Sequence, residues 1–248
     1  MSWTELTYWQ WTLLCTGGML IGMAKAGLKG LGLIVVVLLA QVFPAKYSTG
    51  LVLLLLMAAD LMAVVYYRRD AHWPVVWRLM PPALLGIFLG VWMGESMDDL
   101  TFRRVLAWVI IVGLVMIIGM EYRPPSQRVV RHPIVSGLAG LAGGFTTMVG
   151  NAAGPVMSLY LLAAQLPKLA FLGTSAWFFL LMNWVKLPFH IWSWRTVSVQ
   201  SFWIDVFALP FVAIGFFAGI RIIRWIPDKA FRYFVMIVTA IAAVRMLV

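Results

Sequence analysis

Residues 143–155, GGFTTMVGNAAGP, interrupt an apolar segment that runs from 133 to 165 and is 33 residues long. About 20 residues are enough to cross the hydrocarbon core of a bilayer, so this segment is too long for one crossing. A second stretch, AKAGLKGLG at 24–32, interrupts the 35-residue apolar segment 9–43 in the same way. A helix broken inside the membrane exposes N–H and C=O groups, which only protein or a water-lined cavity can satisfy. We therefore expect both segments to break inside the membrane and each break to be a candidate site.

The composition of the whole chain is that of a polytopic membrane protein. Of its 248 residues, 63% are apolar and 11% are charged, whereas soluble domains have about 25% charged residues. The net charge of +10 would suggest a nucleic-acid partner in a soluble protein. Here the basic residues lie between long apolar blocks, as the positive-inside rule expects, and the sequence carries no nucleic-acid motif. The composition excludes a soluble domain, and we expect no nucleic acid among the partners.

Cysteine and histidine usage argues against a metal site. Cys15 is the single cysteine, and the three histidines are scattered without the spacing of zinc ligands. The sequence also lacks GxSxG, HExxH and a phosphate-binding GxxxxGKS/T loop, so it favours neither an enzyme nor an ATP-driven pump. We expect no enzyme activity, no metal and no cofactor.

Eight apolar segments follow one another along the chain, at 9–43, 50–67, 74–94, 103–120, 133–165, 170–190, 203–223 and 231–248. Six of them fit a single crossing, and each of the two long ones would supply two helical pieces. This pattern predicts an all-α membrane protein with up to ten helical elements.

The chain looks duplicated, because glycines and one polar position recur at a fixed spacing. A shift of 123 residues places Asp60 on Asn183, and after a six-residue insertion a shift of 129 places Gly86 on Gly215. Glycines that hold one spacing carry more weight than leucines, which match by chance in apolar sequences. We predict a first repeat, a basic cytoplasmic linker and a second repeat, at 1–122, 123–132 and 133–248.

The distribution of basic residues tests how the second repeat is oriented. If 133–165 crosses once, the 16 basic residues of the loops divide 8 to 8 between the two sides. If it turns back as a hairpin, they divide 11 to 5, and the larger, cytoplasmic group comprises Arg68, Arg69, Arg78, Arg123, Arg128, Arg131, Lys168, Arg221, Arg224, Lys229 and Arg232. The hairpin leaves three further transmembrane helices in each repeat, inverts the halves and puts the N-terminus on the periplasmic side. The alternative is two long kinked helices, with eight crossings and parallel halves.

The second arm of each broken segment is predicted to point its N-terminus at the middle of the membrane. Pro155 suits the first turn of a helix that would run to Gln165, about 16 Å or half a bilayer, and the counterpart begins near Leu31. The free N–H groups and the positive end of each helix dipole favour an anion. The glycines expected to let the backbone approach that anion are Gly27, Gly30, Gly150 and Gly154.

Polar side chains near the breaks complete the candidate substrate site, and they are Lys25, Lys29, Thr147, Asn151, Thr174, Ser175, Trp177 and Asn183. A lysine deep in the bilayer costs about 2.5 to 3.5 kcal/mol on insertion scales, which an anionic substrate or Asp60 would offset. Asp60 is also the candidate for a coupling proton, since burial favours the neutral acid and a nearby lysine favours the carboxylate.

Several of these side chains have a structural alternative. The hydroxyls of Thr146, Thr174 and Ser175 bond their own helix more often than a ligand. Lys29 is as well placed to reach the membrane surface as to line a pathway. For Lys186 and His190, four residues apart near a helix end, reaching the membrane surface is the favoured interpretation.

The breaks GMAKAGLKGLG and GLAGLAGGFTTMVGNAAGP, with the stretch LLAAQLPKLAFLGTSAWFFLLMNWVKLP, resemble the TauE/SafE family of sulfite and organosulfonate exporters. The resemblance covers nearly the whole chain. It implies a bacterial or archaeal inner-membrane carrier with duplicated halves, for sulfite, sulfoacetate, sulfolactate or related small anions. The family features fall on 22–32, 143–155 and 173–175, and this chain departs from the usual glycine-dense first break by placing Lys25 and Lys29 in it.

We expect a secondary transporter that moves a small sulfur-containing oxyanion by alternating access, with the lipid bilayer and a coupling proton or cation as further partners. The alternatives are an anion channel of the same architecture, a carrier of another small anion such as a carboxylate, and a purely structural membrane subunit. The sequence leaves the oligomeric state open, a homodimer included.

Overall fold

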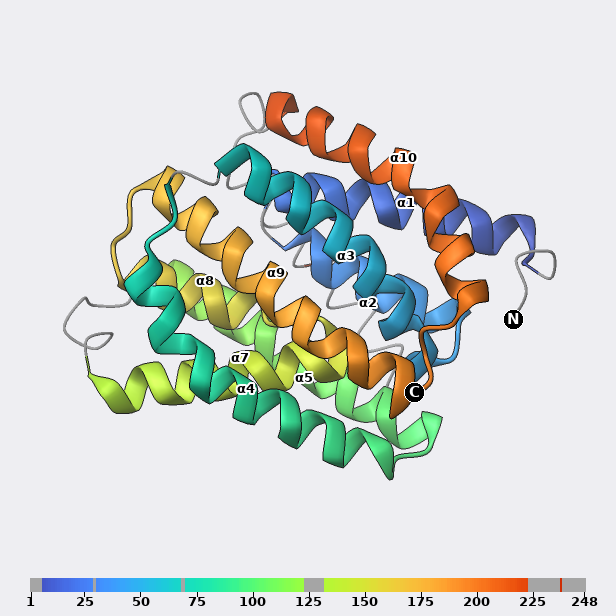
Figure 1. Ribbon diagram of the computed structural model, residues 1–248, viewed down its shortest axis with the longest axis horizontal. Coiled ribbons are helices and arrows are strands. Elements are labelled where there is room, and N and C mark those ends of the chain that lie inside the picture. The colour runs from blue at the N-terminus through green and yellow to red at the C-terminus, as the bar shows by residue number, and fades with distance from the viewer. Residues whose placement is uncertain (1–5, 29, 68–69, 123–131, 223–236, 238–248) are drawn as a thin grey trace.

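The computed structural model describes residues 6–28, 30–67, 70–122, 132–222 and 237 (Figure 1). Within these residues the chain forms nine helices and no strand: α1 (Tyr8–Lys25), α2 (Leu31–Val42), α3 (Ala45–Tyr67), α4 (Trp73–Glu95), α5 (Asp99–Tyr122), α7 (Pro133–Gly150), α8 (Gly154–Ala163), α9 (Lys168–Trp192) and α10 (Val199–Ile222). The prediction of an all-α protein is confirmed. The predicted linker apart from residue 132, and the last apolar segment apart from residue 237, lie outside the described residues.

The chain is a multi-pass membrane protein. Five of the described helices, α3, α4, α7, α9 and α10, are long and apolar enough to cross a bilayer. The apolar helices α2 and α8 have 12 and 10 residues, so at 1.5 Å per residue they extend about 18 Å and 15 Å. Each is therefore about half as long as the 30 Å hydrocarbon core.

Both predicted breaks are present, and they fall where the backbone leaves the right-handed helical region. In the first, Gly27 and Gly30 have φ of 124° and 93°, values that residues with a Cβ rarely adopt. In the second, Asn151 has φ of 51° and ends α7, and Pro155 lies in the first turn of α8 as predicted. The second arms begin at Leu31 and Gly154, within one residue of the predicted starts.

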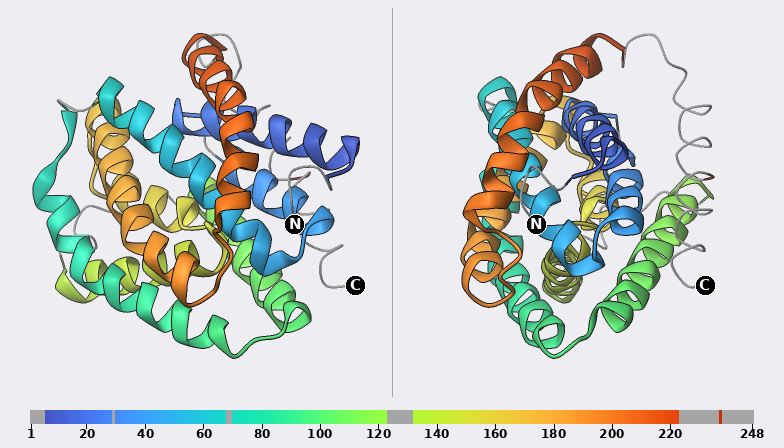
Figure 2. Two further views of the ribbon diagram at one scale, coloured as in Figure 1. Left: turned by 45° about the vertical axis from the view of Figure 1, so that its right-hand side comes forward. Right: turned by 90° about the vertical axis from the view of Figure 1, so that its right-hand side faces the viewer.

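Each second arm folds back on its first arm. A methyl group on Gly17, in the middle of α1, would lie 3.1 Å from Val35 of α2, and one on Gly143 of α7 would lie 4.0 Å from Val156 of α8. In Figures 1 and 2, α7 and α9 begin at the same end of the molecule, which a single crossing by 133–165 would not allow. The segments are therefore hairpins rather than continuous kinked helices. Their arms are unequal, because the first arms, α1 and α7, have 18 residues each.

Two tightly packed helix pairs enclose α3 and α9, which pack against each other. The α1–α10 pair lies at the top of Figures 1 and 2, and the α4–α7 pair lies at the bottom. In each pair a glycine allows backbone to meet backbone: a methyl group on Gly86 of α4 would collide with the carbonyl oxygen of Leu141, and one on Gly215 of α10 with that of Met19. Small residues at helix contacts are typical of membrane proteins, where close packing replaces the hydrophobic effect.

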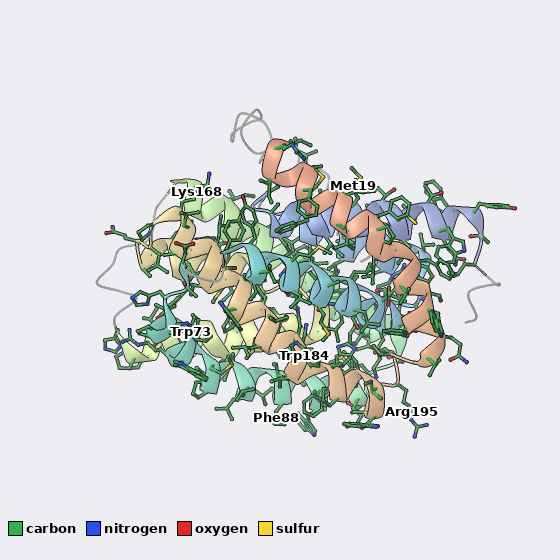
Figure 3. All side chains as sticks on the ribbon, turned by 45° about the horizontal axis from the view of Figure 1, so that its top comes forward. Met19, Trp73, Phe88, Lys168, Trp184 and Arg195 are labelled. Carbon is green, nitrogen blue, oxygen red and sulfur yellow. The ribbon has the colours of Figure 1, made fainter. Side chains whose placement is uncertain are left out.

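Large apolar side chains cover the outside of the bundle, as Figure 3 shows for Phe88 and Trp184. In a soluble protein a surface of this kind would be an aggregation hazard, whereas in a bilayer it contacts lipid. Figure 3 also places Trp73 and Lys168 at one end of the bundle and Arg195 at the other. The loops at the two ends are therefore separated by the apolar length of the helices.

Candidate functional site

A cavity of about 220 Å³ lies where the two breaks meet. Its walls come from the two breaks with the helices beside them, from α3 and from one face of α9. The polar or glycine residues among them are Lys25, Gly27, Gly30, Gly32, Thr147, Asn151, Gly154, Ser158, Ser175 and Asn183. Eight of these ten were predicted from the sequence as site residues. Two stretches more than a hundred residues apart thus form one site.

The N-terminal ends of α2 and α8 both open into this cavity. Neither helix has a side chain that caps its first turn, so the N–H groups there are not taken up by a capping residue. Gly32 and Gly154 line the cavity, and the space beside each α-carbon is open. Two positive helix ends that share one cavity are suited to an anion.

Lys25 and Asp60 form an ion pair beside the cavity, with 2.6 Å between Nζ and Oδ1. The Asp60 side chain is fully buried, whereas that of Lys25 is 16% exposed and lies 4.2 Å from the centre of the Phe179 ring. Asn183 donates from Nδ2 to Oδ2 of Asp60 at 2.7 Å. The carboxylate therefore offsets the burial of the lysine, one of the two partners expected from the sequence.

Lys186 lies beside the cavity, and its predicted position at the membrane surface is wrong. The expectation was a lysine that reaches the membrane surface, but its side chain is fully buried. Its Nζ donates to Oδ1 of Asn151 at 2.6 Å, and to the carbonyl oxygen and Oγ1 of Thr147 at 3.0 Å and 3.1 Å. The physical reason is that α7 ends against this face of α9, so that the ammonium group satisfies the carbonyl end of α7.

His190 was also expected at the membrane surface, and this prediction is wrong because the α9–α10 loop folds back over the end of α9. Its imidazole is fully buried, and its Nδ1 lies 2.7 Å from Oγ1 of Thr196. A sequence signal for both residues existed, since Asn183, Lys186 and His190 are spaced by three and four residues and so share one helical face. That face turns inward.

A sequence model of the sulfite exporter TauE/SafE family matches residues 14–246, nearly the whole chain. The chain belongs to the TauE/SafE family. It is a membrane transporter and not an enzyme, and both breaks lie inside the matched range. No curated protein and no solved structure matches the chain.

Some residues predicted for the substrate site of this TauE/SafE protein lie outside the cavity wall. Thr174 accepts a hydrogen bond from the backbone N–H of His72 at 2.8 Å, and the Trp177 ring lies 5.0 Å from that of Trp73. Gly150 lies against Leu106. Lys29 lies outside the described residues.

Serine and threonine hydroxyls near the cavity differ in their partners. Thr146 donates to the carbonyl oxygen of Ala142 in its own helix, which is the structural alternative for this residue. Ser158, which the sequence analysis missed, and Ser175 both line the cavity, and in the described part of the chain neither hydroxyl makes a hydrogen bond. A signal for Ser158 was its position four residues after Gly154, on the same face of α8.

The charge of the central site is positive. In their ordinary ionised forms Lys25 and Lys186 contribute two positive charges against the one negative charge of Asp60. Among the described residues no group of three His, Cys, Asp or Glu side chains could hold a metal ion. In this TauE/SafE protein the central site is therefore better suited to an anion than to a cation.

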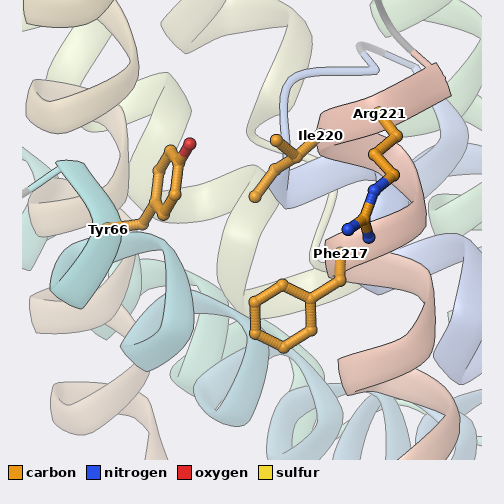
Figure 4. Close-up of a pocket in the computed structure, with 4 residues that line it drawn as sticks. All are labelled: Tyr66, Phe217, Ile220 and Arg221. Carbon is orange, nitrogen blue, oxygen red and sulfur yellow. The ribbon is translucent and has the colours of Figure 1, made fainter.

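A second hollow, of about 270 Å³, lies between the ends of α3 and α10 (Figure 4). Its lining consists of Tyr66, Phe217, Ile220 and Arg221, with no residue of the central cavity among them. Arg221 thus supplies a cation beside a hollow that neither break reaches, which makes it a useful control for Lys25.

Proposed function

We propose that this TauE/SafE protein is a secondary transporter that moves small sulfur-containing oxyanions, such as sulfite or sulfoacetate, by alternating access across the inner membrane. The observation that supports this is the cavity into which the N-terminal ends of α2 and α8 and the side chain of Lys25 converge. An oxyanion presents several acceptor oxygens around one centre. The two helix ends, with the hydroxyls of Ser158 and Ser175, offer donors from several directions.

Lys25 is the proposed group that exchanges partners during transport. It is bound to Asp60, yet it is partly exposed to the cavity. An anion that enters competes with Asp60 for the ammonium group, and the released carboxylate can then take up a proton. Asp60 is therefore the proposed acceptor of the coupling proton at this site.

The proposed architecture is a pair of inverted repeats, 1–122 and 133–248, joined by the basic linker. Two observations support it. Asp60 and Asn183, which are equivalent under the shift of 123, bond to each other, as equivalent residues do only close to a two-fold axis. Gly86 and Gly215, equivalent under the shift of 129, each pack against the first arm of the opposite half. Inverted repeats place substrate sites at the repeat interface.

The proposed orientation puts the basic loops, including Lys168, in the cytoplasm and the N-terminus in the periplasm. The hairpin supports this orientation, because it divides the basic residues 11 to 5 between the two sides and the larger group marks the cytoplasmic side. The separation of Lys168 and Arg195 at opposite ends of the bundle agrees with it. A homodimer remains compatible with this arrangement.

Flux in proteoliposomes tests the proposed function. We expect purified protein to accumulate radiolabelled sulfite against its own gradient when a proton gradient is imposed, and sulfoacetate to compete with it. An anion channel of the same architecture would give downhill current without accumulation. A carboxylate carrier would be competed by simple carboxylates and not by sulfoacetate. Vesicles that move none of these anions would contradict the proposal.

A further inference from the structure

One face of α9 carries a row of buried polar side chains. Asn183, Lys186 and His190 are each 1% exposed or less, and their spacing keeps them on the same side of the helix. Ionisable residues inside membrane helices are expensive to bury and usually mark substrate, ion or proton pathways. The central site uses Asn183 and the ammonium group of Lys186, but it gives no role to His190.

The row begins at the central site. Asn183 is bonded to Asp60, and Lys186 is bonded to Asn151 and Thr147, both of which line the cavity. Lys186 is three residues from Asn183 and four residues from His190, so it lies one helical turn from each. The ammonium group of Lys186 is therefore placed between the anion site and the imidazole.

The row ends at the loop between α9 and α10. The backbone N–H groups of Thr196 and Val197 donate to the carbonyl oxygen of His190 at 2.8 Å and 3.1 Å, so the loop folds back over the end of α9. The Thr196 hydroxyl reaches His190 Nδ1, and the ring of Trp194 lies 5.1 Å from the imidazole. Arg195, beside these two residues, is exposed. One loop residue thus separates the buried histidine from the outside of the bundle.

His190 keeps one nitrogen available for a proton. Its Nε2 is buried and has no hydrogen-bond partner in the described part of the chain. The charged groups that act on the imidazole are Lys186 on its own helix and Lys46 on α3, and Lys46 donates to the carbonyl oxygen of Gly94. The one ion pair among the described residues, Lys25 with Asp60, does not involve His190.

We propose that Lys186, His190 and Thr196 form a proton pathway along α9, which connects the central site with the α9–α10 loop. The inference rests on the proposed transport of an anion with a coupling proton, and it adds the route by which that proton reaches Asp60. A proton from water at the loop binds the imidazole. Once an anion has drawn Lys25 away, the Lys186 ammonium group gives a proton to the Asp60 carboxylate and takes up the proton of the imidazolium. Each step moves one proton from one nitrogen or oxygen to the next, and no other bond changes.

The experiment compares His190→Gln with His72→Gln in proteoliposomes that contain a pH-sensitive dye. His72 is an exposed histidine of the α3–α4 loop, so its variant controls for the loss of an imidazole. Two quantities are measured for each protein: exchange of radiolabelled sulfite at equal pH on both sides, and accumulation of sulfite together with dye-reported proton movement under a pH gradient. Because sulfite itself carries protons, only the difference between the two variants is interpreted.

We expect His190→Gln to retain exchange within about twofold and to lose accumulation and the associated proton movement, whereas His72→Gln retains both. Thr196→Val, which keeps the imidazole but removes its Nδ1 partner, is expected to slow accumulation and to spare exchange. If His190→Gln does not fold, Thr196→Val provides the test of the pathway in its place.

Accumulation by His190→Gln or by Thr196→Val at the rate of His72→Gln would overturn the pathway. Equal dye-reported proton movement in His190→Gln and His72→Gln would also overturn it, although the transport proposal would stand. Absence of all sulfite flux in the unmodified protein would instead contradict the proposed function itself.

Discussion

The side-chain amide of Asn183 donates a hydrogen bond to the carboxylate of Asp60 at 2.7 Å, and the two residues are 123 positions apart, the shift that aligns the two halves of the sequence. In the proposed repeats, one equivalent position therefore carries an acid in the first half and its neutral amide counterpart in the second. Asp60 pairs with Lys25, whereas its counterpart Asn183 needs no cation. The two halves thus contribute unequally to the charge of the central site.

Replacement of Lys25 by alanine is expected to weaken sulfite binding by about 1.5 to 3 kcal/mol, which is tenfold or more, because a charged donor is lost from the cavity. The same change leaves the Asp60 carboxylate buried without its cation, which typically costs about 3 to 5 kcal/mol of stability. The double variant Lys25→Ala, Asp60→Asn should recover stability and not affinity. Thermal unfolding with and without sulfite measures both quantities.

The control for this pair of variants is Arg221→Ala, which removes a cation from the second hollow. We expect it to leave sulfite affinity unchanged. Equal losses of affinity in Lys25→Ala and Arg221→Ala would show that the effect comes from the overall charge of the protein and not from the cavity.

Asp60→Asn alone is not expected to lose sulfite affinity as Lys25→Ala does, but it is expected to lose the response to a proton gradient. It frees Lys25 from its ion pair, so sulfite should bind as tightly as in the unmodified protein or more tightly. Since the amide cannot take up a proton, sulfite uptake should no longer respond to an imposed pH gradient. Uptake measured at equal and at unequal pH separates these two effects, and a variant that is still driven by the pH gradient would exclude Asp60 as the proton acceptor.

Gly154→Ala tests the helix end directly. The space beside Gly154 is open and belongs to the cavity, so the added methyl group should leave the fold intact and narrow the binding site. We expect a larger loss of affinity for sulfoacetate than for the smaller sulfite. Gly137→Ala, in α7 and also beside open space, is the matched control. Unchanged affinity for both anions in Gly154→Ala would place the bound anion elsewhere.

The breaks could be predicted from the sequence because they depend on local backbone preferences. Gly27 and Gly30 adopt positive φ, and Pro155 is suited to a first helical turn, so these residues determine where the helices stop and start. The identity of the ion pair was also accessible, since Asp60 is the single acid within the crossings of the first half.

The rotation of α9 about its own axis, which decides which of its side chains face the cavity, could not be predicted in the same way. A helix turns 100° per residue, so Ser175 can line the cavity while Thr174 and Trp177 point elsewhere. The neighbours that decide this rotation, the end of α7 and the α3–α4 loop, are distant in sequence. Lys186 shows the same limit, because its burial depends on the carbonyl end of α7 and on Asn151.

The tight helix pairs predict a matched effect in the two halves. A methyl group on Gly86 or on Gly215 would collide with backbone of the facing helix, which cannot move aside as a flexible side chain can. We expect Gly86→Ala and Gly215→Ala each to destabilise the protein by about 1 to 3 kcal/mol, the range for overpacking, and Gly137→Ala to have little effect. Unfolding in detergent by heat or denaturant measures the difference. A large loss in one variant and none in the other would argue against equivalent halves.

Cysteine labelling tests the second hairpin and the orientation together. The single native cysteine is first replaced by Cys15→Ser, and one cysteine is then introduced at His132, Lys168 or Arg195, each of which is exposed. Because α7 and α8 form a hairpin, positions 132 and 168 lie on one side of the membrane and position 195 lies on the other. An impermeant maleimide added to intact cells should therefore reach position 195 alone, and positions 132 and 168 only after the membrane is opened. Labelling of 132 and 168 from opposite sides would contradict the hairpin, whereas labelling of both from outside would keep the hairpin and reverse the orientation.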